Sequence, residues 1–449
     1  MLPPKMSFLH SHSLEATKSE LDLFTVPPTQ TSIEKGQVIP YKPFSSISNS
    51  GPIEFVVPGH GEDYIDLAHT MLFVKAQILD GQGNPLHNNE NDPAAAAAAV
   101  GPVNNWLHSL FTQVEVYFNQ KRVSPSAGNY AYRAYIDTLL TYGSTAKNSH
   151  LGCALWYKDT AAKFSTPAEN DGFKKRAQFT RNSQEVELYG SLYCDVFNMN
   201  KFLLNEVELR VILSRSKSEF CLLGTAGGNY SVKITDASLF VRKVRLNPKI
   251  LLSHASILNQ TTAKYPLTLV ETKSFVIGAN VRNKSFDNIY LGQLPKRLVI
   301  GFVSNRAYNG DLTLNPFNFQ HFNVNFLVLF VDGEQIPSKP LQPDFTSIGQ
   351  YVQCYHTLFS GIGTHYEDDG NDISLEEYPN GYCLFAFDLT PDISGSTASH
   401  WSPTMLGNLR MEIGFSAPVA EAINCMVYAE FDSLIQIDKQ RNIIVGNGS

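Results

Sequence analysis

The chain of 449 residues lacks the residue patterns that mark several common protein classes. Its six cysteines are widely spaced and contain no CxxC pair, so they predict neither a zinc site nor a disulfide framework. No apolar run approaches the roughly 20 residues that a membrane helix needs, and the N-terminus has no apolar signal core. GxSxG, P-loop and GxGxxG motifs are absent. These absences predict a soluble, unsecreted protein with reduced cysteines, no membrane insertion and no cofactor.

Two kinds of short motif resemble a metal-binding pattern and a catalytic nucleophile pattern, but the residues around them do not support either function. His10, His12 and Glu15 resemble the metal-binding pattern of cupins, but they lie in a polar segment and not on strands. Ser144–Lys147 and Ser214–Lys217 match SxxK, a nucleophile pattern, without the SDN and KTG motifs that accompany it. The sequence therefore predicts no metal site and no enzyme.

The net charge and the charged segments also give little indication of a dedicated ligand site. The formal net charge of −7 argues against a protein that coats nucleic acid over its whole surface. The acidic stretch 367–377 either holds a divalent cation between subunits or forms a solvated loop, and the basic segment 174–181 either contacts nucleic acid or forms another such loop. In both segments the solvated loop is the simpler interpretation.

What the chain does contain is one element twice, about two hundred residues apart. Phe111–Phe118 is followed by a polar turn and then by Tyr132, Tyr135 and Thr138. Phe322–Val331 is followed by Asp332-Gly333 and then by Tyr351, Tyr355 and Thr357. Both copies read as a strand, a tight turn and a short helix with aromatic anchors. A second matching pair, Val207–Ser214 and Leu409–Ser416, keeps the same order, which predicts two copies of one all-β domain in tandem.

The repeat divides the chain into five parts. We expect an extended N-terminal arm over 1–45, a first jelly roll over 46–247, a linker over 248–266, a second jelly roll over 267–438 and a C-terminal tail over 439–449. Short alternating strands and Gly/Pro/Asn turns favour two tandem eight-stranded jelly rolls with short inserted helices. In that topology the first and last strands of a roll pair antiparallel.

The expected strands follow the alternation of apolar and polar residues. In the first half they are Ile53–Val57, Leu72–Leu79, Leu110–Phe118, Val186–Cys194, Val207–Ser214 and Tyr230–Arg245. In the second half they are Leu267–Ala279, Leu298–Val303, Phe322–Val331, Tyr382–Asp388, Leu409–Ser416 and Asn424–Ile437. Two excursions interrupt the first half: one contains the alanine run 94–99, either a short helix or a loop tip, and the other spans about 141–183.

The strand Phe322–Val331 is apolar on both faces. Phe322, Val324, Phe326, Val328 and Phe330 are expected on one face, with Leu327, Leu329 and Val331 on the other. Because a strand that is apolar on both faces is covered on both faces, Leu327, Leu329 and Val331 are candidates for a domain or subunit interface.

Cations gather where the last strand of each domain ends. They are Arg242, Lys243, Arg245 and Lys249 in the first domain, and Lys439 and Arg441 in the second. If the ends of both rolls emerge on one side, these residues form a basic inner face for sequence-independent contact with packaged DNA. The alternative is that they cap exposed strand ends.

Several segments carry a family resemblance along nearly the whole chain, in order. They are Met6–Ser13, Lys18–Phe24, Pro27–Ile33, Asp137–Gly143, Ala154–Tyr157, Val427–Phe431 and Ile437–Asn442. In these segments the chain resembles the major capsid protein of Polinton/Maverick elements and adintoviruses. Residues 83–100 fit no family pattern and look like a lineage-specific insertion.

The resemblance implies a structural protein of the virion, assembled inside the host cell. It implies a double jelly-roll hexon that forms a homotrimer and then a capsomer lattice in an icosahedral capsid, with penton and minor capsid proteins as further partners. The alternative from another class is a soluble, monomeric β-sandwich protein that binds carbohydrate or a receptor.

Overall fold

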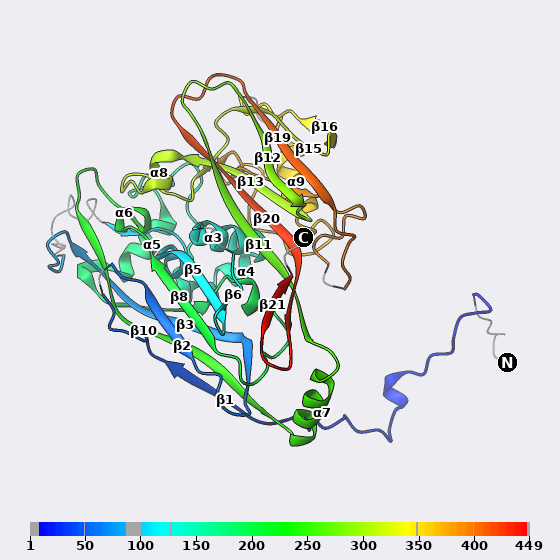
Figure 1. The fold of residues 1–449 in the computed structure, drawn as a ribbon. Coiled ribbons are helices and arrows are strands. Elements are labelled where there is room, and N and C mark those ends of the chain that lie inside the picture. The colour runs from blue at the N-terminus through cyan, green and yellow to red at the C-terminus, as the bar shows by residue number, and fades with distance from the viewer. Residues whose placement is uncertain are drawn as a thin grey trace, which may run out of the picture.

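The structure, a computed structural model, describes residues 9–48, 50–86, 100–125, 128–346, 349–397 and 399–446. Two β-sandwiches, each of two packed antiparallel sheets, follow one another in the chain, with helices between them (Figure 1). The alanine run 94–99 lies outside the described residues, as does most of the 83–100 insertion.

The first roll contains two four-stranded sheets. One has the order β1-β10-β3-β7, with bounds Ile33–Tyr41, Tyr230–Leu246, Tyr64–Asp80 and Val186–Ser191. The other has the order β2-β8-β5-β6, with bounds Ile53–Val57, Leu209–Arg215, Phe111–Phe118 and Lys121–Arg122.

The second roll repeats this arrangement strand for strand. One sheet has the order β11-β20-β13-β18, with bounds Ala263–Ile277, Ile423–Ile437, Arg297–Ser304 and Leu384–Asp388, and β21 (Ile443–Gly446) pairs with β20. The other has the order β12-β19-β15-β16, with bounds Asn283–Gln293, Leu406–Phe415, Val324–Val331 and Glu334–Leu341. In each roll the first strand pairs antiparallel with the last long strand, β1 with β10 and β11 with β20. The chain is therefore a double jelly roll, as the sequence predicts.

Alternation explains why the repeated strands form. In β5, Val114, Val116 and Phe118 are buried, and they lie opposite Leu213, Val211 and Leu209 of β8. The hairpin turns after β5 and β15 use positive φ angles, at Asn119 in the first roll and at Asp332 and Gly333 in the second. Such turns match the twist of the strands that they connect.

Shorter elements fill the connections. The helices after the two repeated hairpins are α3 (Tyr130–Thr141) and α9 (Val352–Ser360). The remaining helices are η1 (Ser19–Leu21), α2 (Trp106–Ser109), α4 (Ser144–Lys147), η2 (His150–Ala154), α5 (Asp171–Phe179), η3 (Arg181–Ser183), η4 (Asp195–Asn198), α6 (Ser218–Cys221), α7 (Pro248–Leu258) and α8 (Asn305–Asn309). Two small ladders pair β4 (Gly101–Pro102) with β9 (Leu222–Leu223), and β14 (Phe319–Gln320) with β17 (Asn380–Gly381).

Three of the expected boundaries shift. The arm is shorter than 1–45 because Ile33–Tyr41 forms β1, an edge strand paired through its backbone to β10. Most β1 side chains are exposed, so the segment shows no alternation, and Pro40 is tolerated because the strand lies at a sheet edge. The expected linker holds α7 and the start of β11, and the expected tail folds back as β21. Among the described residues, no helix is long and apolar enough to cross a membrane.

Candidate functional site

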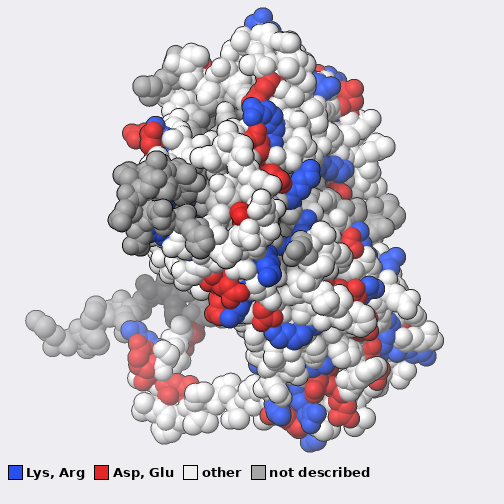
Figure 2. All heavy atoms as spheres, turned by 90° about the vertical axis from the view of Figure 1, so that its left-hand side faces the viewer, with Lys and Arg blue, Asp and Glu red and all other residues white. Residues whose placement is uncertain are grey.

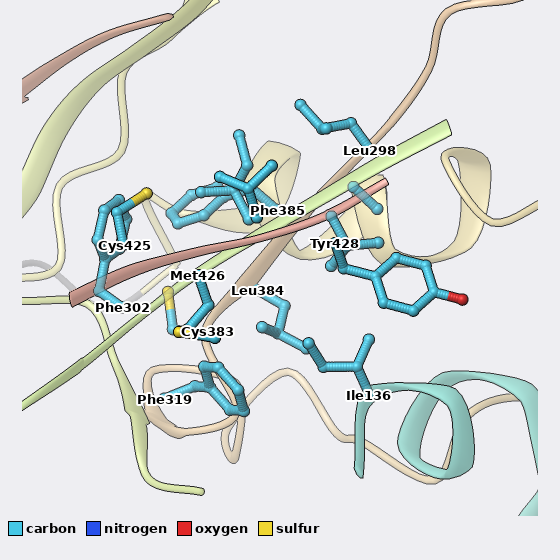
Figure 3. Close-up of a cluster of buried hydrophobic side chains, with 14 of the residues drawn as sticks. Ile136, Leu298, Phe302, Phe319, Cys383, Leu384, Phe385, Cys425, Met426 and Tyr428 are labelled. Atoms are coloured by element: carbon cyan, nitrogen blue, oxygen red, sulfur yellow. The ribbon is translucent and has the colours of Figure 1, made fainter. Parts of the chain in front are cut away.

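The region that holds the two rolls together is the candidate functional site, and α3 lies at its centre. Although α3 belongs to the first half of the chain, Tyr132, Tyr135, Ile136 and Leu139 are part of the hydrophobic core of the second roll. Figure 3 shows Ile136 pointing from α3 toward Leu384 of β18. The helix that the sequence predicts from its aromatic anchors therefore packs across the boundary between the rolls.

Aromatic rings form the apolar part of the contact between the two rolls, which is called the seam below. Tyr135 stacks on Phe317 with ring centroids 4.3 Å apart and an interplanar angle of 1°. Tyr132 stacks on Tyr308 at 5.7 Å. Stacked buried rings hide large apolar areas and add about 0.5–1.5 kcal/mol per pair beyond that burial. These contacts join segments about 180 residues apart along the chain.

A buried ion pair continues the seam on the polar side of α3. The Arg133 guanidinium donates to both carboxylate oxygens of Asp195, at 2.5 and 3.3 Å. Asp195 also accepts the backbone N–H of Val270 in β11, at 3.1 Å. The side chains of Arg133 and Asp195 are 7% and 2% exposed. One carboxylate thus binds the inserted helix of the first roll and the first strand of the second.

Neighbouring charges extend this pair. Arg133 lies 3.5 Å from Asp137, which accepts the hydroxyl of Tyr428 in β20. Tyr428 also lies 3.3 Å from Glu430, and Glu430 receives two hydrogen bonds from Arg297, at 2.8 and 2.6 Å. The network crosses from α3 to β20 and β13 and borders a polar cleft of about 590 Å³.

Burial dominates the acidities in this network. It raises the pKa of Asp137 from 3.8 to about 6, against the opposing effects of Arg133 and the Tyr428 hydrogen bond. Burial likewise raises the pKa of Asp195, although Arg133 acts in the opposite direction. Burial also raises the pKa of the Tyr428 hydroxyl well above 10. A paired network of this kind fixes the position of α3 against β20 and β13.

A second contact ties the end of the chain to the first roll. Ile435 and Ile437 of β20 belong to the core of the first roll. Arg441, in the turn after β20, donates to the backbone and side-chain oxygens of Asn205 at 2.9 and 3.0 Å, and lies 3.4 Å from Glu206. The rolls are therefore joined both at α3 and near the chain end.

The predicted interface residues Leu327, Leu329 and Val331 do not face a partner. They are 0%, 0% and 6% exposed and lie opposite Ile413, Met411 and Leu409 of β19, on the face that lines the core of the second roll. The prediction is wrong for a subunit interface, because the roll itself covers this row. The other row, Phe326, Val328 and Phe330, lies on the opposite face of the sheet, where Val328 is also buried and Arg410 covers the Phe330 ring at 5.1 Å. A bulge between Val324 and Phe326 moves Val324 to the inner face.

The six predicted basic residues lie near the roll ends, but half of them have acidic partners. Arg242 pairs with Asp66, Arg245 with Asp63 at 3.3 Å, and Arg441 with Glu206. Lys243, Lys249 and Lys439 have no carboxylate partner among the described residues of the chain. In Figure 2 blue and red atoms are interspersed at the lower end of the molecule. The arginines therefore act first as structural partners of carboxylates.

The weaker motifs have structural explanations. Lys147 of the first SxxK match is buried and donates to the backbone oxygens of Leu139 and Asn371, and burial lowers its pKa to about 8. Arg176 of the basic segment is fully buried against Asp159 at 2.6 Å. Within the described parts of the chain, no group of three His, Cys, Asp or Glu residues is arranged to hold a metal ion. Sequence reasoning missed the buried pairs Arg133–Asp195 and Arg176–Asp159, because a buried ion pair leaves no local pattern.

Sequence comparison finds a relative of similar length. No protein-family model matches the chain. A Caenorhabditis elegans protein, described as uncharacterized protein F54H12.2, is 27% identical over 425 residues, which cover 94% of this chain and 99% of that protein.

Solved viral structures share the fold along almost the whole chain. A structure of the Sputnik virophage superposes with a TM-score of 0.64 at 11% identity, covering 98% of this chain and 94% of that one. The Faustovirus major capsid protein gives 0.57 at 8% identity, covering 94% and 92%. The mavirus major capsid protein gives 0.51 at 12% identity, covering 99% and 97%. At these identities the likeness shows the double jelly-roll fold.

Proposed function

We propose that this chain is the major capsid subunit of a double-stranded DNA virus or a virus-like transposon. The observation that carries the proposal is the presence of two jelly rolls with one strand order in one chain, fixed to each other by α3 and by the chain end. The capsid proteins that share this fold over nearly their whole length support it. No part of the proposal needs catalysis.

The mechanism is geometric. Three chains related by a threefold axis would present six similar rolls, and such a pseudo-hexagonal capsomer can tile the icosahedral shell. Contacts between different surfaces of identical subunits are heterologous, and they close into a ring when the rotation between subunits allows it. A stable interface of this kind typically buries more than about 1,000 Å². Rigid placement of the two rolls matters here, because a variable angle between them would spoil the sixfold outline.

The lineage and the partners belong to the same proposal. The resemblance to Polinton/Maverick and adintovirus capsid proteins supports a hexon of that group, assembled in the host cell and completed by penton and minor capsid proteins. Contact with packaged DNA would fall to Lys243, Lys249 and Lys439, since the arginines beside them pair with carboxylates.

The DNA contact has its own test. Replacing the three lysines with glutamine should lower DNA retention by assembled particles and flatten its dependence on salt, because each phosphate contact releases counterions. Replacing Lys42, which pairs with Asp236 at 2.8 Å, is the matched control. Unchanged retention and salt dependence in the triple variant would remove DNA contact from the proposal.

Size-exclusion chromatography with light scattering tests the proposed subunit function. A species of three times 49.9 kDa, or spontaneous shells, is the expected result. A monodisperse monomer at every concentration and salt condition would instead favour a monomeric β-sandwich binding protein.

A further inference from the structure

The N-terminal arm exposes a run of large apolar side chains that the other described residues of the chain do not cover. Leu21, Leu23, Phe24 and Val26 are 67%, 76%, 94% and 85% exposed. Water-exposed apolar clusters of this kind mark interaction sites. The sequence Glu20-Leu-Asp-Leu-Phe24 also alternates acidic and apolar residues. This segment, Glu20–Val26, is called the arm motif below.

A groove beside α7 has complementary properties. It is a cavity of about 350 Å³ whose apolar wall includes Phe202, Leu204, Leu246, Ile257 and Tyr265. Its size falls within the range of roughly 300–1,000 Å³ that is typical of ligand sites. Ile257 is 52% exposed although it lines an apolar cavity. This α7 groove is therefore apolar and open to a partner.

The rim of the α7 groove is basic, whereas the arm motif is acidic. Lys201 and Lys264 line the groove, and Lys201 donates to the backbone oxygen of Lys264 at 3.0 Å. His254, hydrogen bonded to Tyr64 at 3.0 Å, lies on the same rim. The arm motif carries Glu20 and Asp22 and no cation. Opposite charges at the rim of an apolar contact favour the correct partner and register.

The arm begins at the same end of the molecule as the α7 groove. Asn247, the residue before α7, donates its backbone N–H to Ser32 at 2.9 Å. From there the arm runs away from the body of the chain (Figure 1). Its apolar side chains therefore lie outside their own subunit, at the level of α7.

We propose that the arm motif of one copy docks in the α7 groove of a second copy of this chain. This inference rests on the proposed capsid function, which places copies side by side, and it names the contact that links them. Leu21, Leu23 or Phe24 would fill the apolar cavity, while Glu20 and Asp22 would meet Lys201 and Lys264. Each subunit would then donate one arm and receive another.

Disulfide trapping in the full-length chain tests the contact. Phe24→Cys and Ile257→Cys are combined in a Cys153→Ser background, since Cys153 is the exposed cysteine. Burial raises the pKa of the remaining five thiols well above the ordinary value of a cysteine, so they react slowly. Oxidation should produce a ladder of linked chains on a non-reducing gel. Phe24→Cys with Leu291→Cys, an exposed position on β12, is the matched control and should give no ladder beyond background.

The outcomes separate this inference from the proposed function. A linked monomer that migrates faster would mean that the arm occupies its own groove, and the absence of any link would mean that the groove is not its site; either result overturns the inference. Light scattering on the reduced sample reports trimers and shells independently. Shells without a ladder would refute only the arm contact, whereas a ladder without trimers or shells would refute only the capsid function.

A second pair of variants on one helix checks the result without engineered cysteines. Ile257→Asp places a charge in the α7 groove, whereas Leu252→Asp changes a residue of α7 that is 72% exposed and does not line the groove. In this experiment residue 24 of the arm carries a cross-linking group other than cysteine, and the product measured is an arm linked to the α7 groove of another copy. Ile257→Asp should abolish this product, whereas Leu252→Asp should leave it unchanged. Equal trapping in both variants would overturn the inference.

Discussion

Loss of the Asp195 carboxylate should destabilise the chain strongly, because this group joins the two rolls. Asp195→Ala would leave the Arg133 guanidinium, whose side chain is 7% exposed, with Asp137 at 3.5 Å as its remaining acidic partner, and would leave the Val270 N–H without its acceptor. Removing one partner of a buried pair costs about 3–5 kcal/mol of unfolding free energy. Asp236→Ala is the control: it breaks a surface pair with Lys42 whose side chains are 63% and 39% exposed, so it should cost at most about 1 kcal/mol.

A double variant distinguishes the energy of the Arg133–Asp195 ion pair from the energy lost through poorer packing. Arg133→Met/Asp195→Ala should be destabilised by less than the sum of its two single variants, with a coupling energy on the order of 2 kcal/mol, because the stranded charge is removed as well. Urea unfolding at one fixed protein concentration measures this, since assembly makes stability depend on concentration. Trp106 and Trp156, both buried, report on the first and second cores by fluorescence. Additivity of the single variants to within about 0.5 kcal/mol would refute the reasoning.

Three further changes probe the same architecture. Because folding raises the pKa of Asp137 from 3.8 to about 6, this group stabilises the fold most below pH 4 and loses that contribution as pH rises through 6. Relative to wild type, Asp137→Asn should therefore gain about 2 kcal/mol between pH 4 and pH 7, and a constant difference in urea unfolding would contradict this. Tyr135→Phe should be neutral or stabilising, because the buried hydroxyl has no hydrogen-bond partner, whereas Tyr135→Ala should cost about 3–5 kcal/mol; equal losses on thermal unfolding would argue against the stacked seam. Deleting residues 1–30, which leaves β1 intact, should spare trimers but impair shells in light scattering and electron microscopy, and normal shells would exclude a role for the arm in assembly.

The repeated architecture can be predicted from the sequence because apolar and polar residues alternate along the repeated strands. β5 and β8 carry clean apolar and polar faces, and their counterparts β15 and β19 keep the same order. The structure confirms the prediction of two jelly rolls with the first and last strands paired. It adds β1, which is held by backbone hydrogen bonds at a sheet edge and has mostly exposed side chains. Such a strand leaves no periodic signal.

The candidate site was harder to predict for a different physical reason. Arg133 and Asp195 are 62 residues apart, and each looks like an ordinary surface charge until α3 brings them together. The interface prediction failed at Leu327 because an apolar residue on a strand that is apolar on both sides can face either way. The bulge after Val324 changes which face of the sheet the preceding side chain lies on. It is a backbone feature that the residue pattern does not show.

Electron microscopy of the purified, expressed full-length chain tests the central claim most directly. The account predicts class averages of a trimer with a hexagonal outline, in which each chain contributes two adjacent rolls and the rolls alternate around the ring. Particles that contain a single chain, or assemblies whose two rolls adopt variable separations, would contradict it.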